Sequence, residues 1–295
     1  MKKNCIGCLL TVLALLLTGC GAMYAPDHAF SDWGDQVHKD MSGAEDAWSY
    51  TLTAEPHSLN HYDEDGRLLV TGSYELPVMQ VFHVDGTPYT QAAESLAPAV
   101  QTAQRVNAAL EQRMKNWKSN FAEICTLAEQ DSQTDSESWD NADYCYTDTV
   151  QAVFWNNSHI ACITLRSESF TGGAHSIRSR SAVTFDMHTG EEITINDMVD
   201  DYAALRDAVA LEILAEIADG KYVKYYDGEL LFDDYRETIP EWMTRAVFFG
   251  EKSMTVVFGV YDIAAYAAGE QAFVIPYTLI APYLNDYGKM VLEIE

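Results

Sequence analysis

Residues 144–170 read YCYTDTVQAVFWNNSHIACITLRSESF, and this stretch decides the fold. Apolar and polar residues alternate on both sides of the short polar segment 156–158, as Val150, Ala152 and Phe154 show for the first half. A period of two is typical of a β-strand with one buried face, and two such runs joined by a short polar turn form a hairpin. The sequence therefore predicts two antiparallel strands here.

A long helix is predicted before this hairpin. Pro98 suits the first turn of a helix, because its fixed φ is helical and its missing N–H is not needed there. The apolar residues that follow recur at steps of three and four: Val106, Leu110, Met114, Trp117, Phe121, Ile124 and Ala128. Such a stripe packs on a sheet. The acidic, serine-rich residues 131–143 predict a solvated loop.

Further strand patterns flank these elements on both sides. An earlier hairpin is predicted from residues 48–53 and 68–81, and later strands from 178–187, 193–195, 245–249, 254–261 and 273–277. A second helix is predicted near 202–218, with Asn196-Asp197 as its N-terminal cap and Gly220 as its end. Strands dominate without a βαβ repeat. The fold class is therefore α+β, a mostly antiparallel sheet with two main helices packed against it.

The composition is that of a folded, strongly acidic protein. Among 295 residues, 48% are hydrophobic and 12% aromatic, which is ample for a core. Acidic residues outnumber basic ones 45 to 18, and the net charge is -27. Such a surface repels nucleic-acid phosphates, so no nucleic-acid partner is expected. It attracts cationic partners, although a large net charge also serves solubility alone.

The N-terminus has the pattern of an exported lipoprotein. Lys2 and Lys3 precede an apolar stretch of about a dozen residues, which is too short to span a bilayer. Residues 17–20, Leu-Thr-Gly-Cys, resemble the lipobox of bacterial lipoproteins. The resemblance implies a signal peptide at 1–19, lipid on Cys20, a flexible tether at 20–45 and a location on the extracytoplasmic face of the cell membrane. The alternative is an ordinary signal peptide with an accidental cysteine.

Three cysteines remain in the mature chain apart from Cys20: Cys125, Cys145 and Cys162. An exported protein can form disulfides, but three thiols leave one unpaired. The order of helix and strand allows a bridge between Cys125 and Cys145, and buried free thiols are the alternative.

Three later stretches resemble one family of extracytoplasmic domains. They are Ser-Phe-Thr-Gly-Gly-Ala-His at 169–175, a strand–turn–strand segment at 185–198, and the segment at 261–277 that contains Tyr-Ala-Ala-Gly and Ile-Pro-Tyr. Together they resemble the domain pair DUF4163 and DUF3298, which would cover 46–165 and 166–295 as one compact unit. The family usually has proline where this chain has Ala265, which puts the rigidity of that loop in question.

The resemblance implies a binding module of the cell envelope. Related domains occur in a lysozyme-sensing anti-sigma factor and beside a peptidoglycan deacetylase, so lysozyme, another cationic protein or wall glycan is the implied ligand. The chain shows neither a sigma-binding segment nor a deacetylase domain, and those activities are not carried over. The alternatives are an enzyme acting on wall polymer and an accessory glycan-binding subunit.

Seven residues are candidates for ligand binding: Gly172, Gly173, His175, Tyr225, Tyr226, Tyr235 and Tyr266. Glycines at a strand exit permit a close backbone approach, by a ligand or simply by the chain itself. The tyrosines could anchor a partner, or could cover the core beneath a loop. Metal-ligand spacings and nucleophile motifs are missing from the sequence, so we expect no catalytic residue, no metal and no cofactor.

Overall fold

The computed structural model describes residues 48–83, 86–89, 98–134, 136–139, 144–220 and 230–294. The predicted signal peptide, the tether with Cys20, and the candidates Tyr225 and Tyr226 lie outside these residues. Within them, every helix is too short or too polar to cross a bilayer.

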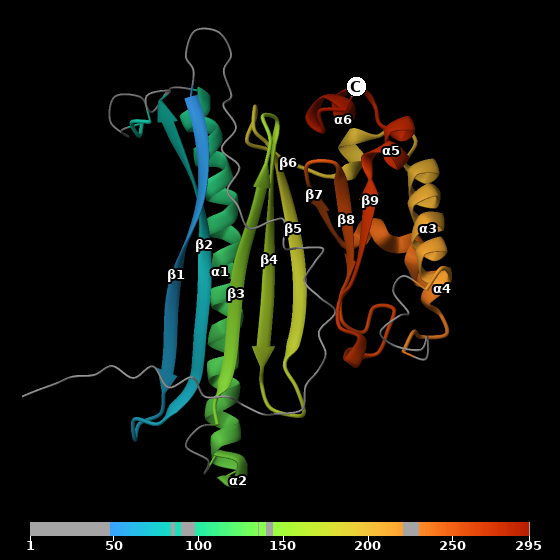
Figure 1. The fold of residues 1–295 in the computed structure, drawn as a ribbon. Helices are drawn as coiled ribbons and strands as arrows, with labels where there is room; N and C mark the ends of the chain where they lie inside the picture. The colour runs from blue at the N-terminus through green and yellow to red at the C-terminus, as the bar shows by residue number, and fades with distance from the viewer. Residues whose placement is uncertain are drawn as a thin grey trace, which may run out of the picture.

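The larger sheet has six strands in sequence order (Figure 1). They are β1 (Trp48–Tyr62), β2 (Leu68–His83), β3 (Tyr146–Asn156), β4 (Ile160–Phe170), β5 (Ile177–Asp186) and β6 (Glu192–Ile193). Both predicted hairpins are confirmed, and the strands of the first, β1 and β2, are longer than the pattern indicated. Only the β2–β3 pair is parallel, because a helical crossover rather than a hairpin connects these two strands.

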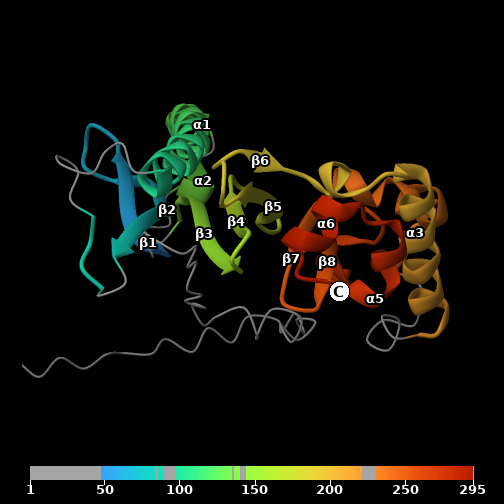
Figure 2. The same ribbon diagram turned by 90° about the horizontal axis from the view of Figure 1, so that it is seen from above.

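Helix α1 (Pro98–Thr134) makes that crossover and lies along one face of the sheet (Figures 1 and 2). The predicted apolar stripe is confirmed, since all its members except Ile124 are buried. The stripe packs on apolar side chains of β1, β2, β3 and β4.

The prediction of a solvated loop at 131–143 is wrong for its first part. Helix α1 continues to Thr134 and is followed by α2 (Ser136–Trp139). Trp139 is 1% exposed and packs among the rings of Tyr144 and Tyr146, beneath the Arg67 guanidinium. Burial of the large Trp139 ring contributes more free energy than solvation of its polar neighbours would, and this holds the α2 segment against the sheet.

The C-terminal part is built around a second, three-stranded antiparallel sheet, β7 (Ala246–Phe249), β8 (Ser253–Phe258) and β9 (Gln271–Pro276). Helix α3 (Tyr202–Ala218) covers its outer side (Figure 2). Shorter elements complete it: η3 (Ile195–Met198), α4 (Tyr235–Thr238), η5 (Ile239–Thr244), η6 (Tyr266–Ala268), α5 (Tyr277–Ile280), η7 (Ala281–Tyr283) and α6 (Asp286–Val291). The mixed α+β class is confirmed, with two sheets where one had been expected.

The cap predicted for α3 is wrong. Asp201, not Asn196-Asp197, caps the helix, because its side chain accepts a hydrogen bond from the Ala204 amide at 3.0 Å. Asp197 instead closes the separate turn η3 by accepting from the Thr194 amide at 2.7 Å. The end of α3 is as predicted, with Gly220 at φ +70°.

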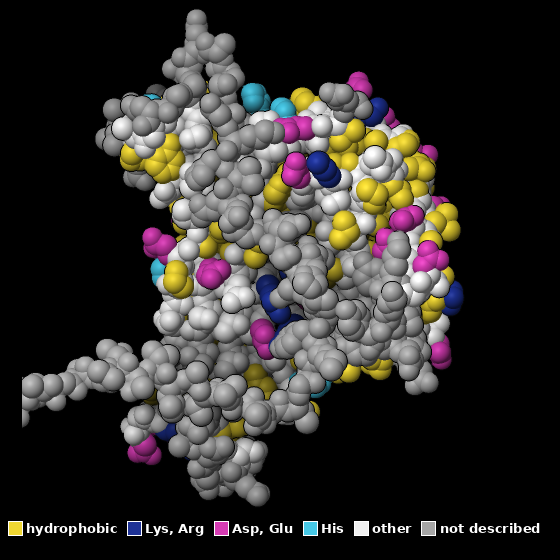
Figure 3. Space-filling view, viewed as in Figure 1, with side chains coloured by type: hydrophobic (Ala, Val, Ile, Leu, Met, Phe, Trp, Pro, Cys, Tyr) yellow, Lys and Arg dark blue, Asp and Glu magenta, His cyan; other side chains and the backbone are white. Residues whose placement is uncertain are grey.

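One of the three buried clusters contains side chains from both sheets. Ile160 and Cys162 of β4 lie in the same buried cluster as Phe248 and Phe258 of the smaller sheet. Polar contacts join the halves as well, since the Asn157 amide donates to the Val291 carbonyl at 2.8 Å. Lys and Arg side chains show in the hollow between the halves (Figure 3). The predicted family junction at 165/166 falls inside β4.

All three cysteines of the described part are free thiols, so the bridge predicted between Cys125 and Cys145 is not formed. Burial raises the pKa of the Cys125 and Cys145 thiols, and the nearby Glu129 carboxylate raises the pKa of Cys125 further. Because the thiolate is the reactive form, both side chains behave as small apolar groups of the core edge.

Candidate functional site

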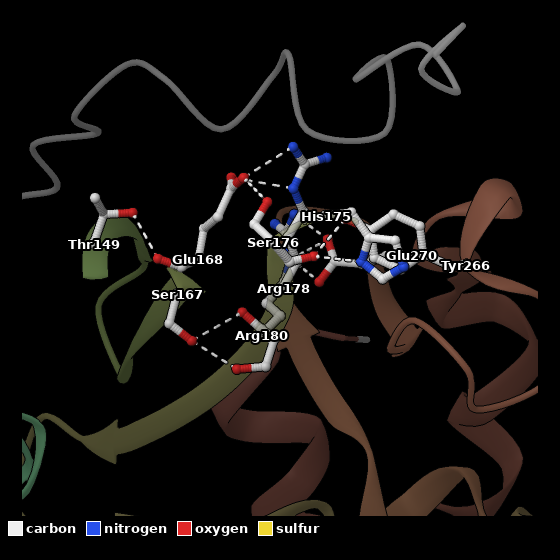
Figure 4. Close-up of polar contacts among 10 residues, drawn as sticks. Thr149, Ser167, Glu168, His175, Ser176, Arg178, Arg180, Tyr266 and Glu270 are labelled. Atoms are coloured by element: carbon white, nitrogen blue, oxygen red, sulfur yellow. Dashed lines mark hydrogen bonds and ion pairs between the residues drawn. The ribbon is translucent and has the colours of Figure 1, made fainter. Parts of the chain in front are cut away.

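The site is built on a stack of two rings from distant parts of the chain. His175 follows the glycine turn before β5, and Tyr266 lies in η6 between β8 and β9. Their ring centroids are 3.5 Å apart, with an angle of 13° between the planes (Figure 4). The Tyr266 hydroxyl donates to the Ser176 carbonyl at 2.5 Å, which fixes the stack to the backbone. The structure thus brings two of the predicted site residues into contact.

Tyr261 completes the cluster, and the sequence analysis did not single it out. Its hydroxyl lies 3.3 Å from Nε2 of His175, and its ring centroid lies 5.7 Å from that of Tyr266. Its backbone has φ +69°, which is uncommon for a bulky residue, and strained positions of this kind cluster at functional sites. The side chain is 53% exposed. We call His175, Tyr261 and Tyr266 the ring surface.

A charged network lies beside His175 and Tyr266 (Figure 4). Glu168 of β4 accepts a hydrogen bond from Ser176 and pairs with the Arg178 guanidinium at 3.1 Å. Burial alone would raise the pKa of Glu168, but the Ser176 hydroxyl and the Arg178 guanidinium hold it below its ordinary value. The carboxylate is therefore ionised at neutral pH and orients the segment that carries His175.

Two further ion pairs lie near the ring surface, one between the two sheets and one within the C-terminal part. Arg180 of β5 binds Glu270, just before β9, with Nε and Nη2 at 3.2 and 2.8 Å from one carboxylate oxygen. Arg245 pairs with Asp262 at 3.1 Å, and Asp262 also accepts from the Gly259 amide at 2.6 Å. The loop that carries Tyr261 is therefore held at its base.

Ala265, where the resembling family has proline, has its own structural role. Its amide donates to the Leu230 carbonyl at 2.8 Å, and a proline could not make this bond. The Phe232 amide likewise donates to the Ile263 carbonyl at 3.0 Å. The segment after residue 229 is thereby paired with the ring-surface loop, and its exposed Asp233 and Asp234 flank that loop.

The two glycines of the strand exit have different surroundings. Both have positive φ, +88° at Gly172 and +87° at Gly173. A side chain at Gly172 would meet the hydroxyls of Tyr144 and Tyr146 at 3.2 and 3.3 Å, whereas one at Gly173 would meet nothing within 4 Å. Gly172 therefore serves close packing, and Gly173 leaves its backbone open beside the ring surface.

Tyr235 lies apart from the ring surface. It packs against the core of the C-terminal part, and the Arg236 guanidinium covers its ring at 4.5 Å from the centroid. Trp242 of the same acidic region is fully buried and donates its indole N–H to the Arg206 carbonyl. Both side chains therefore cover the core, which is the alternative that the sequence analysis left open for such rings.

The polar contacts of the ring surface centre on His175. His175 contacts the Tyr261 hydroxyl through Nε2 and the Ser176 carbonyl through Nδ1, and within the described part of the chain it makes no hydrogen bond to a carboxylate. Among the described residues, no three His, Cys, Asp or Glu side chains are grouped as metal ligands. Tyr261 could have been suspected from the sequence only because it opens the third family-like segment.

Comparison with known proteins finds a family that resembles part of this chain. The family model described as "Protein of unknown function (DUF3298)" matches residues 206–278. These residues are similar to a DUF3298 domain. The domain runs from α3 to α5 and contains the whole smaller sheet with Tyr261 and Tyr266. The family-like segments at 169–175 and 185–198 lie outside the match, and the DUF4163 assignment of 46–165 stays a prediction.

A solved structure of a DUF3298 protein has a similar fold. A member from Bacteroides fragilis is 14% identical, with a TM-score of 0.53, and the match covers 82% of this chain and 96% of that one. A member from Pseudomonas aeruginosa is 17% identical over 83% of this chain and 97% of its own, with a TM-score of 0.45. None of the curated proteins matches this chain. The DUF3298 domain and its larger partner sheet thus form an arrangement already seen in one solved relative.

Proposed function

We propose that this protein is a non-enzymatic binding module of the cell envelope, held at the outer face of the membrane by a lipid on Cys20. Its ligand contacts the ring surface of the DUF3298 domain. The observation that carries the proposal is Tyr261, a half-exposed ring held at φ +69° against His175. Aromatic side chains fixed on a rigid base are the usual anchors of protein partners, because they bury much area at low entropic cost.

The partner class that fits best is a cationic protein such as lysozyme. Signal removal takes Lys2 and Lys3 and no acid from the chain, so the net charge changes from -27 to -29. Asp233 and Asp234 are exposed beside the ring-surface loop. A charged rim around an aromatic centre speeds association with a partner of opposite charge. The resemblance to lysozyme-sensing domains points in the same direction.

The mature chain without its lipid, residues 21–295, should bind lysozyme. Tyr261→Ala should weaken the affinity by about tenfold, as expected for an interface anchor. Asp233→Asn with Asp234→Asn should slow association, and the effect should shrink as sodium chloride rises, because exposed charges are screened over about 8–10 Å. Surface plasmon resonance at several salt concentrations measures both rates.

Matched variants distinguish binding at the ring surface from nonspecific attraction between opposite charges. Tyr62 is 51% exposed at the end of β1, so Tyr62→Ala should leave binding unchanged. Glu111→Gln with Glu123→Gln removes the same charge from exposed positions of α1. Cytochrome c serves as a basic control protein. Equal binding of lysozyme and cytochrome c would contradict the proposal, as would equal effects of the two double substitutions. If lysozyme does not bind, wall glycan becomes the proposed ligand.

The lipid anchor has its own test. Cys20→Ala removes the sulfur that the lipobox would modify, so the protein should leave the membrane fraction. Detergent partitioning and fractionation measure this, and globomycin should block processing of the parent chain. A variant that stays with membranes as the parent does would refute lipid attachment.

A further inference from the structure

The hydrogen-bonding protons of the ring surface all point inward, toward the protein. Nδ1 of His175 lies 3.2 Å from the Ser176 carbonyl oxygen, which can only accept, so Nδ1 carries the proton of the neutral ring. Nε2 is then unprotonated and accepts from the Tyr261 hydroxyl at 3.3 Å. The Tyr266 hydroxyl donates to the same Ser176 carbonyl (Figure 4). Each of these protons is therefore held within the protein.

The ring surface consequently offers lone pairs and ring faces to a ligand. A tyrosine oxygen whose proton is donated inward remains only as an acceptor. Tyr261 is 53% exposed and presents this oxygen and its ring to solvent. The face of an aromatic ring carries partial negative charge and attracts cations. Both features favour a ligand group that donates hydrogen bonds and is positively charged.

The charges around the ring surface favour such a group as well. Three arginines described beside it each pair with a carboxylate: Arg178 with Glu168, Arg180 with Glu270 and Arg245 with Asp262. The neighbouring residues 233–237 add three acids and one arginine, and the bond from the Phe232 amide to the Ile263 carbonyl joins them to the loop of Tyr261. The surroundings are thus net negative, which attracts a cation and repels an anion.

Other ligand groups fit these contacts less well. A carboxylate or phosphate would meet acceptors instead of donors, beside carboxylates that repel it. An apolar side chain packed over Tyr261 would leave the tyrosine oxygen buried without a donor, which is unfavourable. A sugar hydroxyl can donate to that oxygen but gains nothing from the negative surroundings.

We propose that the ring surface binds a cationic side chain of its protein partner, a lysine or an arginine. The ammonium or guanidinium group lies against the Tyr261 ring and donates a hydrogen bond to the Tyr261 oxygen. Such a contact combines a cation–π interaction with a charge-assisted hydrogen bond, and it is stronger where the partner excludes water. It rests on the proposed function, because it names the group with which the partner contacts this surface.

Short peptides test the ring surface without a folded partner. Hexalysine and hexaarginine supply the two cationic groups, and carbamylated hexalysine is a neutral peptide of similar shape that still donates hydrogen bonds. We expect one or both cationic peptides to bind the mature chain, residues 21–295, in calorimetry at physiological salt, where attraction between distant charges is screened. The carbamylated peptide should bind about tenfold more weakly or not at all. The tighter of the two cationic peptides identifies the preferred group.

Variants of Tyr261 assign the binding to this ring. Tyr261→Leu keeps an apolar side chain but removes the ring, so the affinity for the cationic peptides should fall by a factor of about five or more. Tyr261→Phe keeps the ring and removes only the oxygen, so the loss should be about threefold, and this variant also covers the case in which Tyr261→Leu fails to fold. Tyr62→Leu, at the 51% exposed tyrosine of β1, is the matched control and should change nothing.

Lysozyme measured with the same proteins separates this contact from the proposed function. If lysozyme binds but Tyr261→Leu takes up the cationic peptides as well as the parent does, the partner stands and its cationic group is wrong. If the peptides require Tyr261 and lysozyme does not bind, the cationic group stands and lysozyme is wrong. Equal effects of Tyr261→Leu and Tyr62→Leu, or equal binding of the neutral and cationic peptides, would overturn the proposal.

Discussion

Replacing Glu270 with alanine should lower the free energy of unfolding by about 3–5 kcal/mol, because it removes the carboxylate that pairs with the buried, charged Arg180 guanidinium. The two side chains are only 6% and 12% exposed, and they join β5 to the start of β9. The Arg180 guanidinium also lies 6.0 Å from the centre of the Phe248 ring, where water cannot solvate it freely. Urea unfolding of the parent and the variant measures the difference.

An exposed ion pair provides the matched control. Arg113 and Glu192 are 2.6 Å apart but 34% and 45% exposed, so Glu192→Ala should lower the free energy of unfolding by less than about 1 kcal/mol. Adding Arg180→Met to Glu270→Ala should recover much of the lost stability, since the buried charge that Glu270 had neutralised is then gone. Equal losses in the two alanine variants would mean that the buried pair does not hold the sheets together.

Much of the fold follows from local pattern. The stripe on α1 and the alternation in β3 and β4 specify which face of each element is buried, and the structure confirms both. The parallel pairing of β2 with β3 and the division into two sheets could not be predicted in this way. Each depends on contacts between segments far apart in the chain, for which periodicity carries no information.

The candidate site was predictable in part. His175 and Tyr266 were each expected to bind ligand, but their stacking could not be foreseen because 90 residues separate them along the chain. Tyr261 carries no local signal, since its importance lies in a backbone conformation that only the structure shows. Trp139 was misjudged because its polar neighbours dominate the local composition, whereas its burial is decided by rings of a later strand.

The second large effect on stability is expected at a buried carboxyl group. Asp148 of β3 is 4% exposed on the side that faces α1. Burial raises the pKa of Asp148 to about 6, and a polar interaction with the Trp117 indole opposes this only in part. No described cation is paired with it. Above pH 6 the folded protein must therefore hold a buried, unpaired negative charge.

Asp148→Asn should consequently stabilise the protein at pH 7 to 8 and have little effect near pH 4. The unfolded group titrates near 3.8 and the folded group near 6, so between these values the folded state binds more protons and stability falls as pH rises. Two pKa units correspond to about 3 kcal/mol, which residual screening by solvent reduces to about 2 kcal/mol. Above pH 6 the gain from asparagine should be constant.

Thermal unfolding of the parent and Asp148→Asn across pH 4 to 8 tests this expectation. The difference between the two proteins isolates one group, because Glu168, Asp186 and Glu192, whose pKa values are lowered in the folded state, contribute equally to both. Asp200→Asn removes an exposed carboxylate and should give no pH-dependent difference. A gain that is the same at pH 4 and pH 8 would assign the effect to packing rather than to charge. A loss of stability at pH 8 would mean that the ionised carboxylate has a favourable partner, and the raised pKa would then be wrong.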